Sequence, residues 1–416
     1  MENTKDKKCL IVGASHAGVN LAFLLRRQGW AGEIALFDRD PELPYHRPPL
    51  SKGFLSGDTS VEESSLKNKE SYEQANIKLH LGVTVESISP TKQALRLISG
   101  ETHVYDRLVL ATGASAFLPP IPGLKDNDKI FTLRTAADAR HIRQAYQGAD
   151  GKRVVVIGGG YIGLEAAASL RKLGGEVTVL EREDRVLARV TSPEMSAFFT
   201  ELHTGRGVTI ATGHQVTAIT TEKNHVMVTC DKGIHYPADL VIVGVGVTVN
   251  SSLAVAANLQ TANGISVNER MQTSDQKIYA IGDCTNFYHP VYGRELRLES
   301  VQNAIDQAKV TAANLCGTAA AYDAIPWFWS DQYDVKLQMC GLSTGYNRLV
   351  MRREADADEH QRSYWYFADD RLLAVDAVNS ARAYMLGMKL LKEGKSPDPE
   401  KLADPGVALH PKHLMA

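Results

Sequence analysis

The sequence of 416 residues predicts an α/β protein with two Rossmann-like domains followed by a C-terminal α+β domain. Two glycine-rich turns predict the Rossmann-like domains, one at residues 13–18 and the other at residues 158–163. Each turn follows an apolar, β-branched run and opens an amphipathic stretch, which is the order of strand, turn and helix. The composition changes after Pro326, where aromatic residues gather at 327–333 and 364–367, and this change predicts the third domain.

The second glycine turn is a complete dinucleotide-binding fingerprint. In such a turn the first glycine permits the tight bend, the second lets the backbone approach a pyrophosphate, and the third lets helix and strand pack closely. Glu181 follows 23 residues after Gly158, at the end of the next predicted strand, where a carboxylate accepts hydrogen bonds from ribose hydroxyls. The predicted contacts of this site are Gly158, Gly160, Tyr161, Ile162, Gly163 and Glu181.

The first glycine turn departs from the fingerprint at one position. Ser15 stands where the second glycine is expected, and its small side chain carries a hydroxyl that could donate to a phosphate. A Rossmann-like domain with a vestigial site is the alternative interpretation. The acid after the next strand is Asp38 or Asp40. The predicted contacts are Gly13, Ser15, His16, Ala17, Gly18 and Asp38.

Composition and charge exclude several classes of protein. The chain is 44% hydrophobic and 23% charged, with a net charge of −2, as is ordinary for a globular protein. Because there is no long basic run, we expect no nucleic-acid partner. The N-terminus is charged and leads straight into a strand, and the longest apolar runs, of about eight residues, are far too short to span a membrane. We therefore expect a cytoplasmic protein with no membrane partner.

The cysteines are scattered along the chain. No two of the five lie within a few residues of each other, which excludes a Cys-x-x-Cys redox pair, a local iron–sulfur cradle and a zinc knuckle. We expect free thiols and no metal site. The positions are Cys9, Cys230, Cys284, Cys316 and Cys340.

The hydrophobic pattern also predicts the individual elements. Strands are expected near 8–12, 33–37, 78–88, 93–98, 103–106, 107–113, 208–220, 225–229, 234–236, 240–246 and 277–283. Helices are expected at 16–29, 61–75, 161–173, 193–204 and 303–315. The last twenty residues are expected to form a loosely ordered tail, because four prolines interrupt them at 397, 399, 405 and 411.

Five short segments occur in order along the chain. They are Pro48 to Lys52, Ala111 to Gly113, Gly158 to Glu165, Ile281 to Asp283 and Pro326 to Gln332. Together they resemble the flavin-dependent ferredoxin reductases of bacterial oxygenase systems, most of all the putidaredoxin reductase type, which shares the glutathione-reductase-like fold. The resemblance extends from about residue 8 to about residue 395.

The resemblance implies three domains and two nucleotides. It implies an FAD-binding domain made of residues 1–112 and 242–325, an NAD(H)-binding domain at 113–241, and a C-terminal domain at 326–416 near the flavin. FAD is then the bound cofactor and NADH the substrate.

The resemblance also gives roles to Lys52, Glu165 and Tyr161. Lys52 and Glu165 would pair beneath the flavin ring as catalytic residues, and Tyr161 would lie at the nicotinamide entrance. A cation at Lys52 could stabilise the anion formed as hydride arrives at the flavin N5, whereas a surface lysine in a proline-rich loop is the alternative. Tyr161 and Glu165 are four residues apart on one predicted helix and therefore share a face.

Further positions follow from the same resemblance. Arg47 is expected near the flavin diphosphate, and Asp283 is expected to bind the ribityl hydroxyls. Trp327 and Trp329 alternate in an extended segment, so both indoles can face one side, to shield the flavin or to pack at a domain interface. The other positions expected to bind cofactor are Lys52, Ala111, Thr112, Gly113, Gly246, Gly282, Glu299, Ser300, Val301 and Trp329.

The resemblance implies an FAD-dependent NADH:ferredoxin oxidoreductase, whose partner is a small [2Fe-2S] ferredoxin that feeds a cytochrome P-450 type monooxygenase. The alternatives are a Rieske dioxygenase ferredoxin, a rubredoxin or an organic acceptor, or else an NADH-sensing regulatory flavoprotein. NADH is expected over NADPH because the Glu181 carboxylate repels a 2′-phosphate, although the adjacent Arg182 could soften that repulsion. Since small ferredoxins are acidic, the docking face should be locally basic, and Lys309 and Lys336 are candidates for it.

Overall fold

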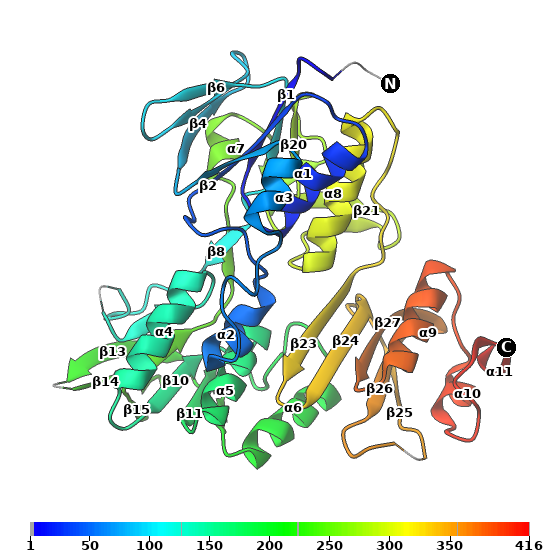
Figure 1. Cartoon of the computed structure of the whole chain (residues 1–416). Coiled ribbons are helices and arrows are strands. Elements are labelled where there is room, and N and C mark those ends of the chain that lie inside the picture. Colours follow the sequence, from blue (N-terminus) through cyan, green and yellow to red (C-terminus); the bar gives the residue numbers. More distant parts are fainter. Residues whose placement is uncertain (1–3, 126, 223, 356, 416) are drawn as a thin grey trace. The chain divides into compact units, whose positions relative to one another are not determined.

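The computed structural model describes residues 4–125, 127–222, 224–355 and 357–415, and Figure 1 shows its helices and strands. The chain divides into two compact units, which are described one at a time. The first unit comprises the residues up to Arg47, Ser60–Ser115 and Val247–Ala324. The second unit comprises Pro48–Thr59, Ala116–Gly246 and the residues from Ile325 onward.

A parallel five-stranded sheet forms the centre of the first unit. Its strands, in spatial order, are β20 (Ile278–Ala280), β7 (Arg107–Leu110), β1 (Lys8–Val12), β2 (Glu33–Asp38) and β3 (Ile77–Leu81). Helices α1 (His16–Arg27) and α8 (Val301–Leu315) lie side by side and share a hydrophobic core with this sheet (Figure 1). Because β1 has β2 on one side and β7 on the other, its carboxyl end lies at a topological switch point, where ligands bind in open α/β sheets.

Smaller elements complete the first unit. One antiparallel sheet consists of β4 (Val85–Ser89), β5 (Ala94–Leu97) and β6 (Thr102–Val104). A four-stranded sheet consists of β18 (Thr261–Ala262), β19 (Gly264–Val267), β21 (Thr285–His289) and β22 (Arg294–Leu296). The remaining elements are α3 (Lys69–Gln74), α7 (Ser252–Ala256) and the paired strands β8 (Ala114–Ala116) and β17 (Val247–Val249).

The second unit contains the same Rossmann-like arrangement. Its parallel sheet consists, in spatial order, of β12 (Thr209–Thr212), β11 (Glu176–Glu181), β10 (Arg153–Ile157), β16 (Leu240–Val243) and β9 (Ile130–Thr132). The helices are α4 (Ala136–Gly148), α5 (Tyr161–Lys172) and α6 (Pro193–Gly205). A three-stranded antiparallel sheet consists of β13 (Val216–Glu222), β14 (His225–Cys230) and β15 (His235–Ala238). The segment 48–59 adds the 3₁₀ turn η1 (Pro48–Ser51) and α2 (Gly53–Ser56).

The C-terminal part of the second unit is an antiparallel sheet covered by a helix. Its strands, in spatial order, are β23 (Trp327–Gln332), β24 (Val335–Gly341), β27 (Arg371–Val378), β26 (Arg362–Ala368) and β25 (Arg348–Arg352). Helix α9 (Ala381–Lys392) packs on β24 and β27, and Gly387 permits the approach, because a Cβ there would lie 2.6 Å from Val375 Cγ2. The prediction of two Rossmann-like domains and a C-terminal α+β domain is confirmed.

The prediction of a loosely ordered tail is wrong. The tail contains α10 (Pro399–Ala403) and α11 (Pro411–Leu414), and Leu402 and Leu414 are fully buried. The buried Arg352 guanidinium donates to three main-chain carbonyls of this segment, at Leu402, Asp404 and Val407. Prolines 399 and 411 begin helices, where a missing N–H costs nothing, so they do not break the structure.

Two further predictions need correction. The polar helix expected at 61–75 is reduced to α3, and its Asn68 cap accepts from Ser71 N. The expected domain limit between residues 241 and 242 falls inside β16, which pairs wholly with strands of the second unit, so the chain leaves that unit after Gly246. Within the described ranges, none of the helices is both long enough and apolar enough to cross a bilayer.

Candidate functional site

The first glycine turn connects β1 to α1 and is held by close backbone contacts. Gly13 has a φ of +111°, and a Cβ on Gly18 would lie 1.9 Å from the carbonyl oxygen of Gly13. Neither position can carry a side chain. Ser15 has φ −107° and ψ −157°, an extended conformation open to any residue. The one departure from the fingerprint is therefore at the position where backbone geometry does not demand glycine.

The second glycine turn repeats this geometry between β10 and α5. Gly158 has a φ of +108°, and a Cβ on Gly163 would lie 2.1 Å from the carbonyl oxygen of Gly158. Gly160, the counterpart of Ser15, has φ −80° and ψ 179°, and a Cβ there would meet no protein atom within 4 Å. The space beside Gly160 is the space that a close-approaching ligand would use.

The acid after each turn is held in the same way in both units. Asp38 accepts from Ala14 N at 2.6 Å and from Asp40 N at 2.9 Å. Glu181 accepts from Gly159 N at 2.7 Å and from Glu183 N at 2.9 Å. This correspondence identifies Asp38, and not Asp40, as the structural counterpart of Glu181.

The helices that follow the turns have no side-chain cap. Neither α1 nor α5 has a capping hydrogen bond or an acidic residue in its first turn. Helices α4, α6 and α8, in contrast, are capped by Thr135, Ser192 and Ser300. An uncapped helix N-terminus carries N–H donors and a positive partial charge, which together suit a diphosphate.

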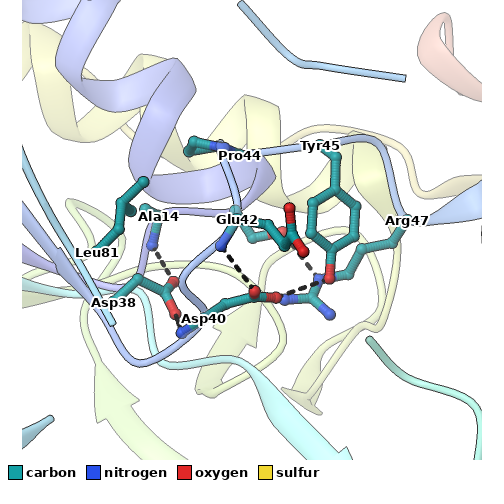
Figure 2. Close-up of a pocket in the computed structure, with 9 residues that line it drawn as sticks. Ala14, Asp38, Asp40, Glu42, Pro44, Tyr45, Arg47 and Leu81 are labelled. Carbon is teal, nitrogen blue, oxygen red and sulfur yellow. Dashed lines mark hydrogen bonds between the residues drawn. The ribbon is translucent and has the colours of Figure 1, made fainter. Parts of the chain in front are cut away.

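A hollow in the first unit opens beside its glycine turn (Figure 2). Arg47 Nε donates to Ser15 Oγ at 3.0 Å, and the Tyr45 hydroxyl donates to Asp40 at 2.7 Å. The Arg47 guanidinium and the N-terminus of α1 are donors that suit a phosphate, and the carboxylates are acceptors that suit hydroxyl groups. The residues therefore fit the phosphate and ribose groups of a dinucleotide. The lining residues are Ala14, Ser15, Asp38, Asp40, Glu42, Pro44, Tyr45, Arg47 and Leu81.

Other predicted residues of the first unit lie at the carboxyl ends of β7 and β20. Ala111 follows β7, and a Cβ on Gly13 would lie 2.2 Å from its carbonyl oxygen. Gly282 N donates to Gln307 Oε1 at 2.7 Å, and a Cβ on Gly282 would lie 3.2 Å from Ala17 Cβ. Asp283 follows, half-buried. These residues therefore gather at the same edge of the sheet as the glycine turn.

The segments at 111–113 and 299–301 have local contacts of their own. Thr112 Oγ1 donates to the carbonyl of Asn250 at 2.7 Å, just before Gly113, whose φ is +61°. Glu299 is exposed and pairs with Arg297 at 2.5 Å. Ser300 caps α8 by accepting from Asn303 N, and α8 begins at Val301. A cofactor contact at these positions stays a prediction.

Lys52 and Glu165 form an ion pair in the second unit. Lys52 Nζ lies 2.7 Å from Glu165 Oε2, which also accepts from Ser51 Oγ at 2.5 Å. Ser330 Oγ donates to the other oxygen, Oε1, at 2.6 Å. The Glu165 side chain is 2% exposed and that of Lys52 is 21% exposed, so the carboxylate is buried and the lysine is partly accessible. Lys52 and Glu165 are therefore in contact, as the resemblance implied, while their place beneath a flavin ring stays a prediction.

One face of β23 runs along the α5 face that carries this pair. Phe328 lies 5.1 Å, ring to ring, from Tyr161, and Ser330 contacts Glu165. Four helix residues rise about 6 Å and two strand residues about 6.6 Å, so the two spacings match. On β23 the rings of Trp327 and Trp329 lie 5.5 Å apart, as their alternation predicts.

Tyr161 is a donor in this arrangement. Its hydroxyl donates to Met339 Sδ at 3.0 Å. Burial raises the pKa of Tyr161 well above its usual value, and the nearby Asp376, Tyr366 and Glu165 raise it further. The phenol therefore keeps its proton at neutral pH.

Two other predicted residues of this unit are exposed. They are Ile162, the residue after Tyr161, and Gly246, which has a φ of +120°.

The two candidate basic residues differ. Lys309 pairs with Asp306 at 2.7 Å, so its charge is offset on its own helix. Lys336 is exposed on β24.

All five cysteines are free thiols, as their spacing predicts, and burial raises the pKa of Cys9 to about 12. Among the residues that the structure describes, no group of three or more His, Cys, Asp or Glu side chains is placed to hold a metal.

Sequence reasoning missed the buried hydroxyls of Ser51 and Ser330 and the pocket residues Glu42 and Tyr45. Ser330 and Gln332 lie in the segment Pro326 to Gln332, and the alternation of side chains along β23 places them on the face opposite to the tryptophans. Two buried polar residues on one face of an aromatic strand were the available signal.

Two family models match the chain. The pyridine nucleotide-disulphide oxidoreductase model matches residues 7–308, and the reductase C-terminal model matches residues 327–412. The chain belongs to the pyridine nucleotide-disulphide oxidoreductase family, as an enzyme of its ferredoxin–NAD(P)⁺ reductase group.

Named relatives are similar over the whole length. Putidaredoxin reductase of Pseudomonas putida is 44% identical over 405 residues, which cover 96% of this chain and 95% of the relative. The ferredoxin–NAD⁺ reductase component of the anthranilate 1,2-dioxygenase system of Burkholderia cepacia is 39% identical over 407 residues, with 96% and 98% covered. The structure of a covalent putidaredoxin reductase–putidaredoxin complex matches with a TM-score of 0.92 and 43% identity, covering 97% of each chain.

The glycine geometry makes a prediction about stability. Gly163→Ala should lower the free energy of unfolding by about 2 kcal/mol or more, because the new Cβ would collide with the carbonyl of Gly158. The matched variant Gly160→Ala should leave stability within about 0.5 kcal/mol of the wild type. Urea unfolding of the full chain measures both, and equal stability of the two variants would contradict the account.

Proposed function

We propose that the protein is an FAD-dependent NADH:ferredoxin reductase, which takes electron pairs from NADH and passes single electrons to a [2Fe-2S] ferredoxin. One observation carries the proposal. Helix α5 begins at the uncapped second glycine turn and, four residues further on, holds the buried Glu165 that pairs with Lys52. We infer that α5 would offer its N-terminus to a diphosphate and that it places the buried Glu165 carboxylate beside Lys52 in the same unit.

FAD would be held by the residues of the first unit. The turn at 13–18, Asp38, Arg47 and Asp283 offer the donors and acceptors that its diphosphate and hydroxyl groups need. When bound, FAD supplies the ability to accept a hydride and release electrons one at a time.

The ion pair would supply the electrostatic part of the reaction. Lys52 and Ser51 contact one oxygen of Glu165 and Ser330 donates to the other, so the carboxylate is held at both oxygens and holds the ammonium in turn. A preorganised positive charge in a partly desolvated site stabilises developing negative charge more strongly than water does. Lys52 is proposed as the residue that does this, and Glu165 as the residue that holds it.

NADH is proposed as the electron donor rather than NADPH. The Glu181 carboxylate is held at the second glycine turn by two backbone N–H groups. The guanidinium of Arg182, the cation that could offset its charge, pairs instead with Glu183 at 2.7 Å and is exposed. A 2′-phosphate would therefore meet negative charge.

The identity of the acceptor rests on the relatives. A [2Fe-2S] ferredoxin of the putidaredoxin kind, serving a cytochrome P-450 type monooxygenase, is supported by the 44% identity to putidaredoxin reductase and by the match to its complex. The ferredoxin of a Rieske dioxygenase is the second candidate, supported by the 39% identity to the dioxygenase component. No cysteine relay is proposed, since the cysteines are free thiols and four of the five are buried.

Substitution of Glu181 tests the choice of nicotinamide. Glu181→Gln removes the charge and keeps the shape, so the preference for NADH over NADPH, measured as the ratio of kcat/KM values, should fall by about tenfold. The matched variant Glu176→Gln removes an exposed carboxylate at the other end of β11, far from the glycine turn, and should leave the ratio unchanged. An unchanged ratio in Glu181→Gln would remove its proposed role.

A panel of acceptors tests the function itself. The purified protein should contain flavin, lose its flavin absorbance with NADH under anaerobic conditions, and reduce putidaredoxin faster than rubredoxin or a quinone. Faster turnover with rubredoxin or quinones would overturn the ferredoxin assignment. Slow flavin reduction with a persistent charge-transfer band would favour a regulatory flavoprotein instead.

A further inference from the structure

Four polar side chains of the second unit form a line of hydrogen bonds that ends on Glu165. Ser330 Oγ donates to Glu165 Oε1 at 2.6 Å, and Gln332 Nε2 donates to Ser330 Oγ at 3.1 Å. His203 Nε2 lies 2.8 Å from Gln332 Oε1, and the Tyr333 hydroxyl lies 3.5 Å from His203 Nδ1. We call Ser330, Gln332, His203 and Tyr333 the Glu165 chain.

The direction of every strong link in the Glu165 chain follows from the acceptor at its end. A carboxylate paired with a lysine can only accept, so the single hydroxyl hydrogen of Ser330 points to Glu165. Ser330 must then accept from the Gln332 amide nitrogen, which leaves the amide oxygen facing His203. The hydrogen of His203 is therefore on Nε2, and all three donors point toward Glu165.

Three of the four residues of the Glu165 chain lie in the core of the unit, and Tyr333 is half-buried. Ser330 and His203 are 0% exposed and Gln332 is 1% exposed. Burial lowers the pKa of His203, which favours the neutral ring with a single N–H that the chain requires. Aligned hydrogen bonds in a low-dielectric interior polarise and strengthen one another, whereas a broken link leaves a buried polar group unpaired.

The residues of the Glu165 chain belong to elements that do not form either glycine turn. Gln332 and Ser330 lie on β23, and His203 lies on α6. They act on the carboxylate oxygen that Lys52 does not hold, because Lys52 and Ser51 both bind Oε2 while Ser330 binds Oε1. The Glu165 chain therefore opposes rotation of the carboxylate about the Cγ–Cδ bond of Glu165.

We propose that Gln332 and His203 are positioning residues for the Lys52–Glu165 pair, and that the Glu165 chain sets both the rate of flavin reduction by NADH and the reduction potential of the bound flavin. The role at the flavin rests on the proposed function. The alternative is that the Glu165 chain only stabilises the fold, which the test below separates from it.

The test uses the full-length holoenzyme with variants of two links. Gln332→Leu replaces the amide with a shorter apolar group and breaks the Glu165 chain in the middle. Ser330→Ala breaks it at the carboxylate, while Ser330→Thr keeps the hydroxyl. Thr200→Val is the matched control, because it removes a hydroxyl hydrogen bond from α6 outside the Glu165 chain. The readouts are the limiting rate of flavin reduction, the KM for NADH, the midpoint potential from a reference-dye titration, and urea unfolding.

Gln332→Leu and Ser330→Ala should each slow flavin reduction by about three- to tenfold, with little change in KM, because the nucleotide turn is untouched. Both should also make the midpoint potential more negative. The double variant should be no slower than the slower single variant, since either change breaks the same chain. Ser330→Thr should stay near the wild type in rate and potential.

Several results would overturn the proposal. Rates and potentials of Gln332→Leu and Ser330→Ala that match those of Thr200→Val, with lowered unfolding free energies, would reduce the Glu165 chain to a structural role. Multiplying effects in the double variant would show independent residues. The dye titration needs neither NADH nor ferredoxin, so a wild type that NADH does not reduce would refute the proposed function, while the potentials would still test the chain.

Discussion

The buried Glu165 carboxylate connects three segments of the second unit. A buried charge is tolerated only when it is paired and hydrogen-bonded. Here Lys52 and Ser51, from the loop at 48–52, and Ser330, from β23, meet this need for a carboxylate that α5 carries. The proline-bounded loop at 48–52, helix α5 and strand β23 are therefore tied at one point. Removing one partner would leave the charge exposed to an apolar interior, which strongly disfavours the arrangement.

The same helix joins this point to the second glycine turn. Gly163 allows α5 to press on the backbone of Gly158, and that contact fixes where the helix begins. Three residues of α5 then follow at four-residue intervals. Tyr161 donates to Met339, Glu165 pairs with Lys52, and Ser169 donates to the carbonyl of Ser51. The position of the charged pair relative to the turn is thus determined by the regular rise of one helix.

Much of this could be predicted from local patterns. The glycine turns, the acids at Asp38 and Glu181, and the free cysteines follow from spacing, because the steric demands of a tight turn act over a few residues. The ion pair came from family resemblance, since no local pattern links Lys52 with Glu165 across 113 residues. The folded tail was missed because its order depends on Arg352, a distant side chain that binds its carbonyls. The Glu165 chain was missed because its partners come from β23 and α6, which sequence alone does not bring together.

We propose that the protein converts electron pairs from NADH into single electrons for an iron–sulfur partner. Anaerobic titration with a limiting amount of NADH, in the presence of excess oxidised putidaredoxin, measures this conversion directly by absorbance and by electron paramagnetic resonance. We expect two molecules of reduced putidaredoxin for each NADH consumed. Consumption of NADH without reduction of the iron–sulfur protein would contradict it.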